Sequence, residues 1–244
     1  EEVILSTKMF FYGGVAKIFD PSVKFDFVLD LVGGQGAGKT SFWQNIAPLG
    51  YYTDQFYTFT DKDDFSVMRK ALIVNDDEMT ATRKASFEEL KRFVTMQQFE
   101  YREPYGRSVS QFAKKFLLVR TTNDLYYLKD KTGERRFLPI LVNKDKQTMN
   151  PVEDLTPDFA QQVWGQAVVE YRQKPDFKFT FNAEQDEVIA EYRRNFMHTD
   201  ELEDEIEDLI ENNWKDKDFI SSADIEFGLS ITSLASDRKL SNRI

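Results

Sequence analysis

The stretch from Gly33 to Thr40 limits the fold more than any other part of this chain. It reads Gly-Gly-Gln-Gly-Ala-Gly-Lys-Thr and fits the phosphate-loop pattern G-x-x-x-x-G-K-[ST]. Such a loop needs a strand before it and a helix after it, because loop amides and the helix N-terminus bind the phosphate together. The apolar run Phe25–Val32 predicts that strand, and Ser41–Ile46 predicts the start of that helix. We therefore expect an α/β domain that binds a nucleotide.

The chemistry of the loop residues suggests individual roles. Glycine lets the backbone close around phosphate oxygens without a Cβ in the way. Lys39 is expected to reach the β and γ phosphates of ATP, and the Thr40 hydroxyl is expected to bind Mg²⁺. The full set of expected nucleotide contacts is Gly33, Gly34, Gln35, Gly36, Ala37, Gly38, Lys39, Thr40 and Ser41.

Composition narrows the class of protein. The chain has 244 residues, of which 41% are hydrophobic, and this supports a real core. It contains no cysteine, so disulfides, thiolate metal sites and cysteine nucleophiles are excluded, and the lone His198 sits in a polar stretch. There is no secretory signal and no long apolar run, so we expect a cytoplasmic protein. The start at Glu1 is consistent with a piece of a longer protein.

An acidic group must complete the Mg²⁺ site. The apolar residues Ala71–Val74 are followed by Asn75, Asp76, Asp77 and Glu78, which places acids at the end of a second strand. Asp77 is expected to hold the metal, through a water molecule, and Glu78 is expected to act as general base. Asp76 could substitute for either of them.

Two further features follow in chain order. A third strand ends at Thr121-Thr122-Asn123, and the Asn123 amide can orient the attacking water because it both donates and accepts hydrogen bonds. Arg135 and Arg136 precede a fourth apolar run, Phe137–Val142. Either arginine suits an arginine finger, which neutralises charge on the transferring phosphoryl group.

The apolar runs alternate with helical stretches, and this predicts a mostly parallel sheet covered on both faces. Residues 1–24 are taken as an N-terminal segment, 25–198 as the ATPase core and 199–244 as a C-terminal helical module. Within the core, helix is expected at 85–99, 159–173 and 183–197, and a short strand at 177–181. The polar residues 143–158 are expected to form a connector.

The C-terminal residues suggest a small module of their own. Ser221 and Ser222 can cap a helix that runs to Phe227, and Gly228 can end it. A second helix is expected over 231–243. Two short helices with a tight turn suggest a helix-turn-helix, winged or otherwise, although a plain helical appendage fits the same pattern.

The order of these features resembles superfamily 3 helicases, a branch of the AAA+ ATPases, in which Walker A, Walker B, a B-prime segment and motif C occupy about the span from Gly33 to Asn123. Residues 89–142 are more closely similar to the virulence-associated protein E family of phage and genomic-island replication proteins, and to the replication initiator helicases of staphylococcal pathogenicity islands. The residues that carry this similarity are Tyr101–Arg107, Thr121–Asn123 and Thr132–Ile140.

The resemblance implies an ATP-driven ring, expected to be a hexamer, that translocates on single-stranded DNA and acts at a replication origin. It places Walker A on Gly33–Thr40, the acidic pair on Asp77 and Glu78, the sensor on Asn123 and the finger on Arg135 or Arg136. The finger would act on the ATP of the neighbouring subunit. Many family members carry an acid where Asn75 stands, so the roles of residues 75–78 stay open.

A B-prime segment would form a pore hairpin. Residues 101–120 carry a net charge of +4 although the whole chain carries −10 and residues 200–218 carry −8. Basic groups with aromatics between them suit binding to single-stranded DNA without sequence preference. The expected stacking groups are Tyr101, Tyr105 and Phe112, the expected phosphate contacts are Arg107, Lys114 and Lys115, and Gly106 is the expected turn.

Other functions fit parts of the same pattern. An AAA+ loader or remodeller would act on a protein partner, and a DNA-binding module regulated by ATP would rely on the C-terminal helices. A small-molecule kinase would need an acceptor pocket that no motif marks. A GTPase would need Asn-Lys-x-Asp, and Asn143-Lys144-Asp145 is followed by Lys146 instead.

Overall fold

The computed structural model of the chain describes residues 1–102, 108–128, 134–174, 176–198, 206, 209–214 and 219–229. The chain forms two compact units, Glu1–Phe196 and Met197–Ile244, which are described separately below. In the described residues, no helix combines the length and the apolar character that a membrane crossing requires.

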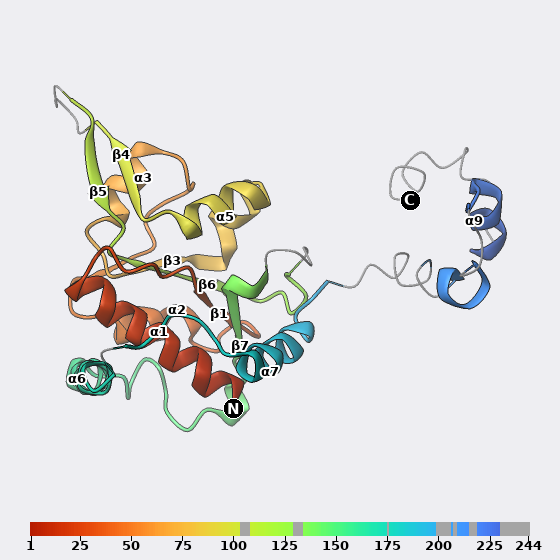
Figure 1. Ribbon diagram of the computed structural model, residues 1–244. Helices are drawn as coiled ribbons and strands as arrows, with labels where there is room; N and C mark the ends of the chain where they lie inside the picture. The colour runs from red at the N-terminus through yellow and green to blue at the C-terminus, as the bar shows by residue number, and fades with distance from the viewer. Residues whose placement is uncertain are drawn as a thin grey trace. The chain divides into compact units, whose positions relative to one another are not determined.

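The first unit is built on a five-stranded parallel sheet (Figure 1). Its strands are β1 (Val28–Val32), β2 (Tyr52–Thr53), β3 (Ile73–Asp76), β6 (Leu117–Thr122) and β7 (Phe137–Leu141), in the order β2-β3-β6-β1-β7. The central strands β1, β3 and β6 are buried along their whole length, as their mostly apolar sequences predict, and they also bury the polar residues Asp30, Asp76 and Arg120. Pro139 lies on the edge strand β7, where a missing amide donor is tolerated. The predicted parallel α/β sheet is confirmed.

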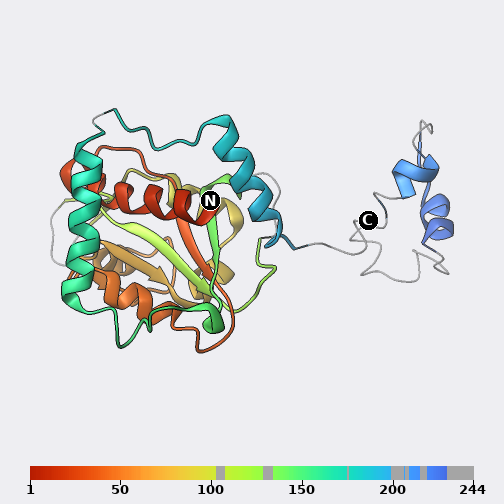
Figure 2. The ribbon, with the colours of Figure 1, turned by 90° about the horizontal axis from the view of Figure 1, so that it is seen from below.

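Helices cover both faces of this sheet. Figure 2 shows α1 (Glu2–Phe19) and α6 (Pro157–Arg172) on one face, where α2 (Lys39–Ile46) and α7 (Ala183–Arg194) also lie. The other face carries α4 (Thr80–Lys84) and α5 (Phe87–Thr95), while α3 (Lys62–Met68) lies near a hairpin. On the α1 face, the rings of Phe10 and Trp43 meet with centroids 5.1 Å apart.

The N-terminal segment is an 18-residue helix, α1, which the sequence analysis did not foresee. Residues Met9–Lys17 of this helix are buried. Gly13 and Gly14 allow close packing, because a Cβ at Gly14 would lie 2.8 Å from the ring of Trp164 on α6. The same two glycines lower the helix propensity of the segment, and this hides the helix from a reading of sequence alone.

The helix predicted over 85–99 is shorter than expected. It begins at a capping box made by Ser86 and Glu89 and ends at Thr95. The next residues form β4 (Gln98–Tyr101), which pairs antiparallel with β5 (Ser110–Ala113). Figure 1 shows this hairpin projecting from the sheet. Its expected turn at Gly106 lies outside the described residues.

The short strand predicted at 177–181 is wrong, because this segment pairs with no strand among the described residues. Its alternating phenylalanines make ring contacts instead. Phe177 meets Tyr12, Phe179 meets Phe25 and Phe181 meets Phe27, with centroids 5.0, 5.5 and 5.2 Å apart. Every second side chain therefore faces the core without any ladder of backbone hydrogen bonds. The following helix, α7, ends at Arg194 rather than Met197.

The second unit contains a π-helical turn, Ile210–Trp214, and α9 (Ser222–Gly228). The Ser221 hydroxyl accepts from the Asp224 amide and caps α9, as the sequence predicted. The helix expected over 231–243 lies outside the described residues, so the winged-helix fold stays a prediction.

Candidate functional site

The carboxyl ends of β1, β6 and β3 bring the expected nucleotide residues together. The glycine loop follows β1, Asn123 follows β6 and Asp77 follows β3. Because β6 lies between β1 and β3, Asn123 lies between the loop and the acids. The register confirms this alignment, since Val32 pairs with Thr122 and Asp76 pairs with Arg120. Crevices at the carboxyl ends of parallel strands are the usual ligand sites of α/β sheets.

Lys39, the first residue of α2, lies among these groups. Its Nζ donates to the carbonyls of Gly33 and Gly34 at 2.8 and 3.0 Å and to Asn123 Oδ1 at 2.8 Å. Burial lowers the pKa of Lys39, and the nearby charges of Glu78 and Asp77 partly oppose this change. Three oxygen acceptors therefore hold the ammonium group between the start of the loop and Asn123.

The loop itself has the backbone geometry of an anion-binding turn. Gly36 and Gly38 have φ of 76° and 74°, in the left-handed region that favours glycine. A Cβ at Gly38 would lie 2.2 Å from Pro151, so this position also needs a small residue for packing. In the part of the chain that the structure describes, no protein acceptor binds the amides of residues 34–38. Those donors are thus available to an anion.

The remaining loop residues surround this turn. Gly34, Gln35 and Gly36 are exposed, whereas Ala37 is buried and its carbonyl accepts from Gln147 at 2.7 Å. Ser41 is half-buried on α2.

Thr40 and Asp77 form the part of the site that suits a metal ion. The Thr40 hydroxyl donates to Asp77 Oδ1 at 2.6 Å, and Thr121 donates to the same oxygen at 2.8 Å. Hydroxyl and carboxylate oxygens are ligands that Mg²⁺ accepts, together with phosphate oxygens and water. Among the described residues no group of three acids or histidines could hold a metal alone. The donor set therefore fits Mg²⁺ bound jointly with a phosphate.

Asp76 and Asn75 have structural roles, which corrects the expectation that Asp76 could replace Asp77 or Glu78. The Asp76 carboxylate is buried and accepts from the amides of Ala81 and Thr82 at 2.8 and 2.9 Å, so it caps α4. The Asn75 amide donates to the Tyr52 hydroxyl at 3.0 Å. The same Asn75 amide nitrogen also donates to Asp77 Oδ1 at 3.4 Å.

Glu78 lies in a strained turn beside the loop. Its φ is 51°, and Met79 also has φ of 51°, which is rare for two consecutive residues other than glycine. The Glu78 amide donates to the Thr121 hydroxyl at 2.9 Å, which holds the turn in place. Its carboxylate accepts from the Asn123 amide, with both oxygens at 3.0 Å. Strain of this kind concentrates at functional sites.

Arg135 and Arg136 lie at the amino end of the strands, whereas the phosphate loop lies at their carboxyl end. They directly precede β7, whose first residue Phe137 pairs with Val28. Gly33 follows the last residue of β1, so about six residues at roughly 3.3 Å each, or about 20 Å, separate Arg136 from the loop along the strands. An arginine side chain cannot span that distance. The two guanidinium groups are therefore out of reach of the loop in their own chain.

Arg193 anchors the segment that carries these arginines. This buried side chain of α7 donates from Nε to the Phe137 carbonyl at 3.0 Å and from Nη2 to the Arg135 carbonyl at 3.4 Å. Arg135 and Arg136 line a cavity of about 670 Å³ together with Lys24 and Lys178. The sequence analysis missed Arg193 because it is one of several charged residues on an amphipathic helix.

Only some of the residues expected to contact DNA are described by the structure, and fewer are exposed. Tyr105 and Arg107 lie outside the described residues. Lys114 is a correction, because it is buried and donates to the carbonyls of Phe93 and Val94 at 3.1 and 2.8 Å, at the end of α5. Tyr101 is also buried, with its ring 4.8 Å from that of Phe112, so it offers no stacking surface. Lys115 is exposed at the base of the hairpin.

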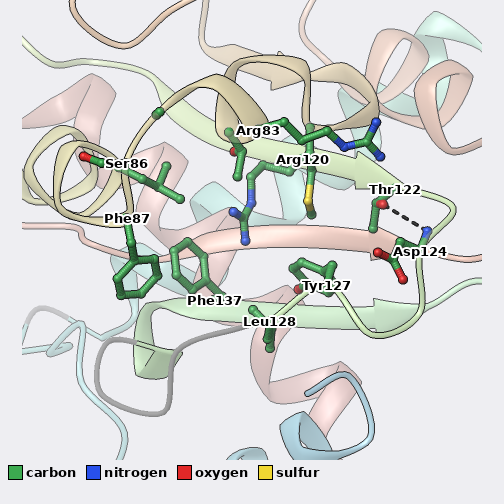
Figure 3. Close-up of a pocket in the computed structure, with 13 residues that line it drawn as sticks. Arg83, Ser86, Phe87, Arg120, Thr122, Asp124, Tyr127, Leu128 and Phe137 are labelled. Carbon is green, nitrogen blue, oxygen red and sulfur yellow. Dashed lines mark hydrogen bonds between the residues drawn. The ribbon is translucent and has the colours of Figure 1, made fainter. Parts of the chain in front are cut away.

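A buried ion pair lies in the sheet behind the site. Arg120 on β6 donates from Nε to Asp30 Oδ1 on β1 at 2.8 Å, and the Tyr127 hydroxyl donates to the same carboxylate. Burial raises the pKa of Asp30, although Arg120 opposes the change. Figure 3 shows Arg120, Tyr127 and Phe137 at a cavity of about 330 Å³. The sequence analysis missed this pair, although one charged residue inside each of two mostly apolar strands was an available signal.

One family model covers most of the chain. The virulence-associated protein E-like domain matches residues 4–198 of the chain. Two solved structures of the apo NrS-1 C-terminal region, both in the A form, have TM-scores of 0.42. One is 15% identical over 84% of this chain and 54% of its own, and the other is 16% identical over 80% and 45%. The chain thus spans about half the length of these structures. The comparison with curated proteins found no match.

Proposed function

We propose, from the premise that this chain belongs to the virulence-associated protein E-like family, that it is an ATP-hydrolysing motor of the superfamily 3 (AAA+) type. It would serve the replication of a phage or another mobile genetic element and move along single-stranded DNA as a ring. The observation that carries this proposal is the continuous set of contacts from Lys39 through Asn123 to Glu78.

This arrangement supports a division of labour at a bound triphosphate. Lys39 and the free amides of the loop would neutralise the β and γ phosphates. Mg²⁺, bound by Thr40 and Asp77, would supply additional positive charge to the phosphate oxygens. Glu78 would accept a proton from the attacking water. Asn123 contacts both Lys39 and Glu78, so it would orient that water toward the γ-phosphate.

The place of the arginine pair supports assembly of several subunits. Arg135 and Arg136 cannot reach the loop of their own chain, so they would act on the ATP of a neighbouring subunit. An arginine finger supplied in this way accelerates phosphoryl transfer by about 10³ to 10⁵-fold in other nucleotide hydrolases. Hydrolysis would then depend on ring formation, and a hexamer remains the expected ring.

The proposal is tested by measuring ATP hydrolysis with and without single-stranded DNA on a sample whose mass in solution is known. We expect DNA-stimulated hydrolysis in the assembled form only. Lys39→Ala should abolish hydrolysis, and Glu78→Gln should bind ATP without hydrolysing it. Hydrolysis by the Lys39→Ala variant at the normal rate would refute the site.

A second candidate is an AAA+ loader or remodeller of a protein partner. The burial of Lys114 and Tyr101 favours it, because these residues are removed from the expected DNA-binding surface of the hairpin. Replacement of Arg107 and Lys115 then distinguishes the two functions. If both are replaced by alanine and DNA still stimulates hydrolysis fully, the DNA motor loses support. If stimulation is lost while basal hydrolysis persists, the DNA motor is favoured.

A further inference from the structure

A further cavity, of about 430 Å³, opens at the amino ends of the strands, opposite the phosphate loop. It is formed where the end of α1, the turns before β2, β3 and β6, and the middle of α6 meet. We refer to it as the α1–α6 groove. Its lining includes the hydrophobic side chains of Ile18, Phe19, Tyr51 and Trp164 and the basic side chains of Lys70 and Lys115.

The α1–α6 groove exposes an unusual amount of apolar surface. Ile18, Phe19 and Tyr51 are 56, 54 and 56% exposed, although each is a large hydrophobic side chain. Leu49 and Val169, which follow the lining residues Pro48 and Val168 in the sequence, are exposed as well. Contiguous apolar surface of this kind marks binding sites more often than chance exposure of single residues does. Nothing in the nucleotide chemistry of the opposite edge requires it.

The rim of the groove carries positive charge. Lys70 and Lys115 line it and are exposed, and the Arg172 guanidinium lies 5.0 Å from the centre of the Phe19 ring. No aspartate or glutamate is among the residues that line the groove. The chain as a whole has a net charge of −10, so this local excess of cations is opposite in sign to the average surface.

We propose that the α1–α6 groove binds an acidic amphipathic helix of a partner protein. Leucine-like side chains of the helix would enter the apolar floor, and its carboxylates would meet Lys70 and Lys115. Charge alone would also fit single-stranded DNA. Among the lining residues, however, only Arg69, Lys70 and Lys115 carry charge, and this apolar lining with cations beside it matches the two faces of an amphipathic helix better than a chain of phosphates. Bases stacked on the exposed rings of Phe19 and Tyr51 are the alternative that the test separates.

The test uses the full chain and a fluorescent synthetic helix of about 18 residues, with leucine on one face and glutamate elsewhere. Binding is followed by fluorescence anisotropy. We expect Lys70→Glu/Lys115→Glu to weaken binding by about tenfold or more, because two attractive charge pairs become repulsive. Ile18→Glu should abolish binding, since it places a carboxylate on the exposed apolar surface of the groove. The matched control Lys84→Glu/Lys144→Glu makes the same change of net charge at exposed lysines near the other edge of the sheet and should leave binding within about twofold.

Three results would overturn the proposal. Equal binding of a leucine–lysine helix would show that the rim does not select for acids. Failure of the helix to bind, combined with oligothymidine binding that Lys70→Glu/Lys115→Glu removes, would make the groove a DNA site. Self-association that Ile18→Glu removes, without helix binding, would make it an interface between copies of this chain. None of these results depends on whether the chain hydrolyses ATP.

Discussion

Asn123 holds Glu78 symmetrically, because its Nδ2 lies 3.0 Å from both carboxylate oxygens. The oxygen of the same amide accepts from Lys39 at 2.8 Å. One side chain therefore fixes the distance between the proposed phosphate-binding cation and the proposed general base. An asparagine at the end of another strand could not contact both Lys39 and Glu78, since only β6 lies between β1 and β3.

Asn123→Ala should lower kcat for ATP by about a hundredfold or more, because the attacking water loses its orienting group. Nucleotide affinity should change much less, since Lys39 keeps its contacts with the carbonyls of Gly33 and Gly34. Steady-state hydrolysis and binding of a fluorescent nucleotide measure the two effects separately. Asn143→Ala, at an exposed asparagine, serves as control. Unchanged kcat in the Asn123 variant would remove this residue from the mechanism.

Thr121→Val should lower kcat by about 10 to 100-fold. The Thr121 hydroxyl donates to Asp77 and accepts from the Glu78 amide, so its loss releases both acids of the site at once. The free energy of unfolding should fall by only about 1–2 kcal/mol. Urea denaturation and Mg²⁺-dependent hydrolysis give the two numbers. Thr53→Val removes another buried hydroxyl, on β2, and should affect stability alone.

The loop and the sheet were predictable because their signals are local. Gly33–Thr40 is one short contiguous segment, and the buried strands are mostly apolar runs that can be recognised without knowledge of their partners. The hydrogen bond between Thr40 and Asp77 was also predictable, because the carboxyl ends of parallel strands lie at the same end of the sheet.

Other features depend on contacts that no local pattern contains. Lys114 looks like a surface base in the sequence, yet the end of α5 supplies two carbonyls that hold it in the core. Phe177, Phe179 and Phe181 alternate as in a strand, but aromatic neighbours satisfy them without a ladder. The strained turn at Glu78 is equally invisible, because an ordinary residue occupies a conformation that favours glycine.

Lys114 should make the stability of the fold depend on pH. Burial lowers the pKa of Lys114 from 10.5 to about 7, so between pH 7 and 10.5 the unfolded chain binds a proton that the folded chain does not. Raising the pH through this window therefore stabilises the native protein. We expect the free energy of unfolding to rise from pH 6.5 to 9.5 in the wild type relative to Lys114→Met. Urea denaturation at both pH values measures this difference, and parallel curves for the two proteins would contradict it.

Arg193→Met should disable the arginine pair without harming the nucleotide site of its own chain. Arg193 holds the backbone at Arg135 and Phe137, so its loss should displace the proposed finger and reduce hydrolysis by about 10³-fold. ATP binding should persist. The exposed neighbour Arg194→Met is the matched control and should hydrolyse ATP normally.

Mixing subunits separates a positioning role of Arg193 from general damage. Glu78→Gln subunits keep an intact arginine pair, so they should restore hydrolysis at the sites of Arg193→Met subunits and equally at those of Arg135→Ala/Arg136→Ala subunits. Recovery with the double alanine variant but not with Arg193→Met would show that Arg193 acts on its own site or on folding. No recovery with either variant, at any ratio, would refute catalysis between subunits altogether. Thermal melting of each variant checks that the comparison is made between folded proteins.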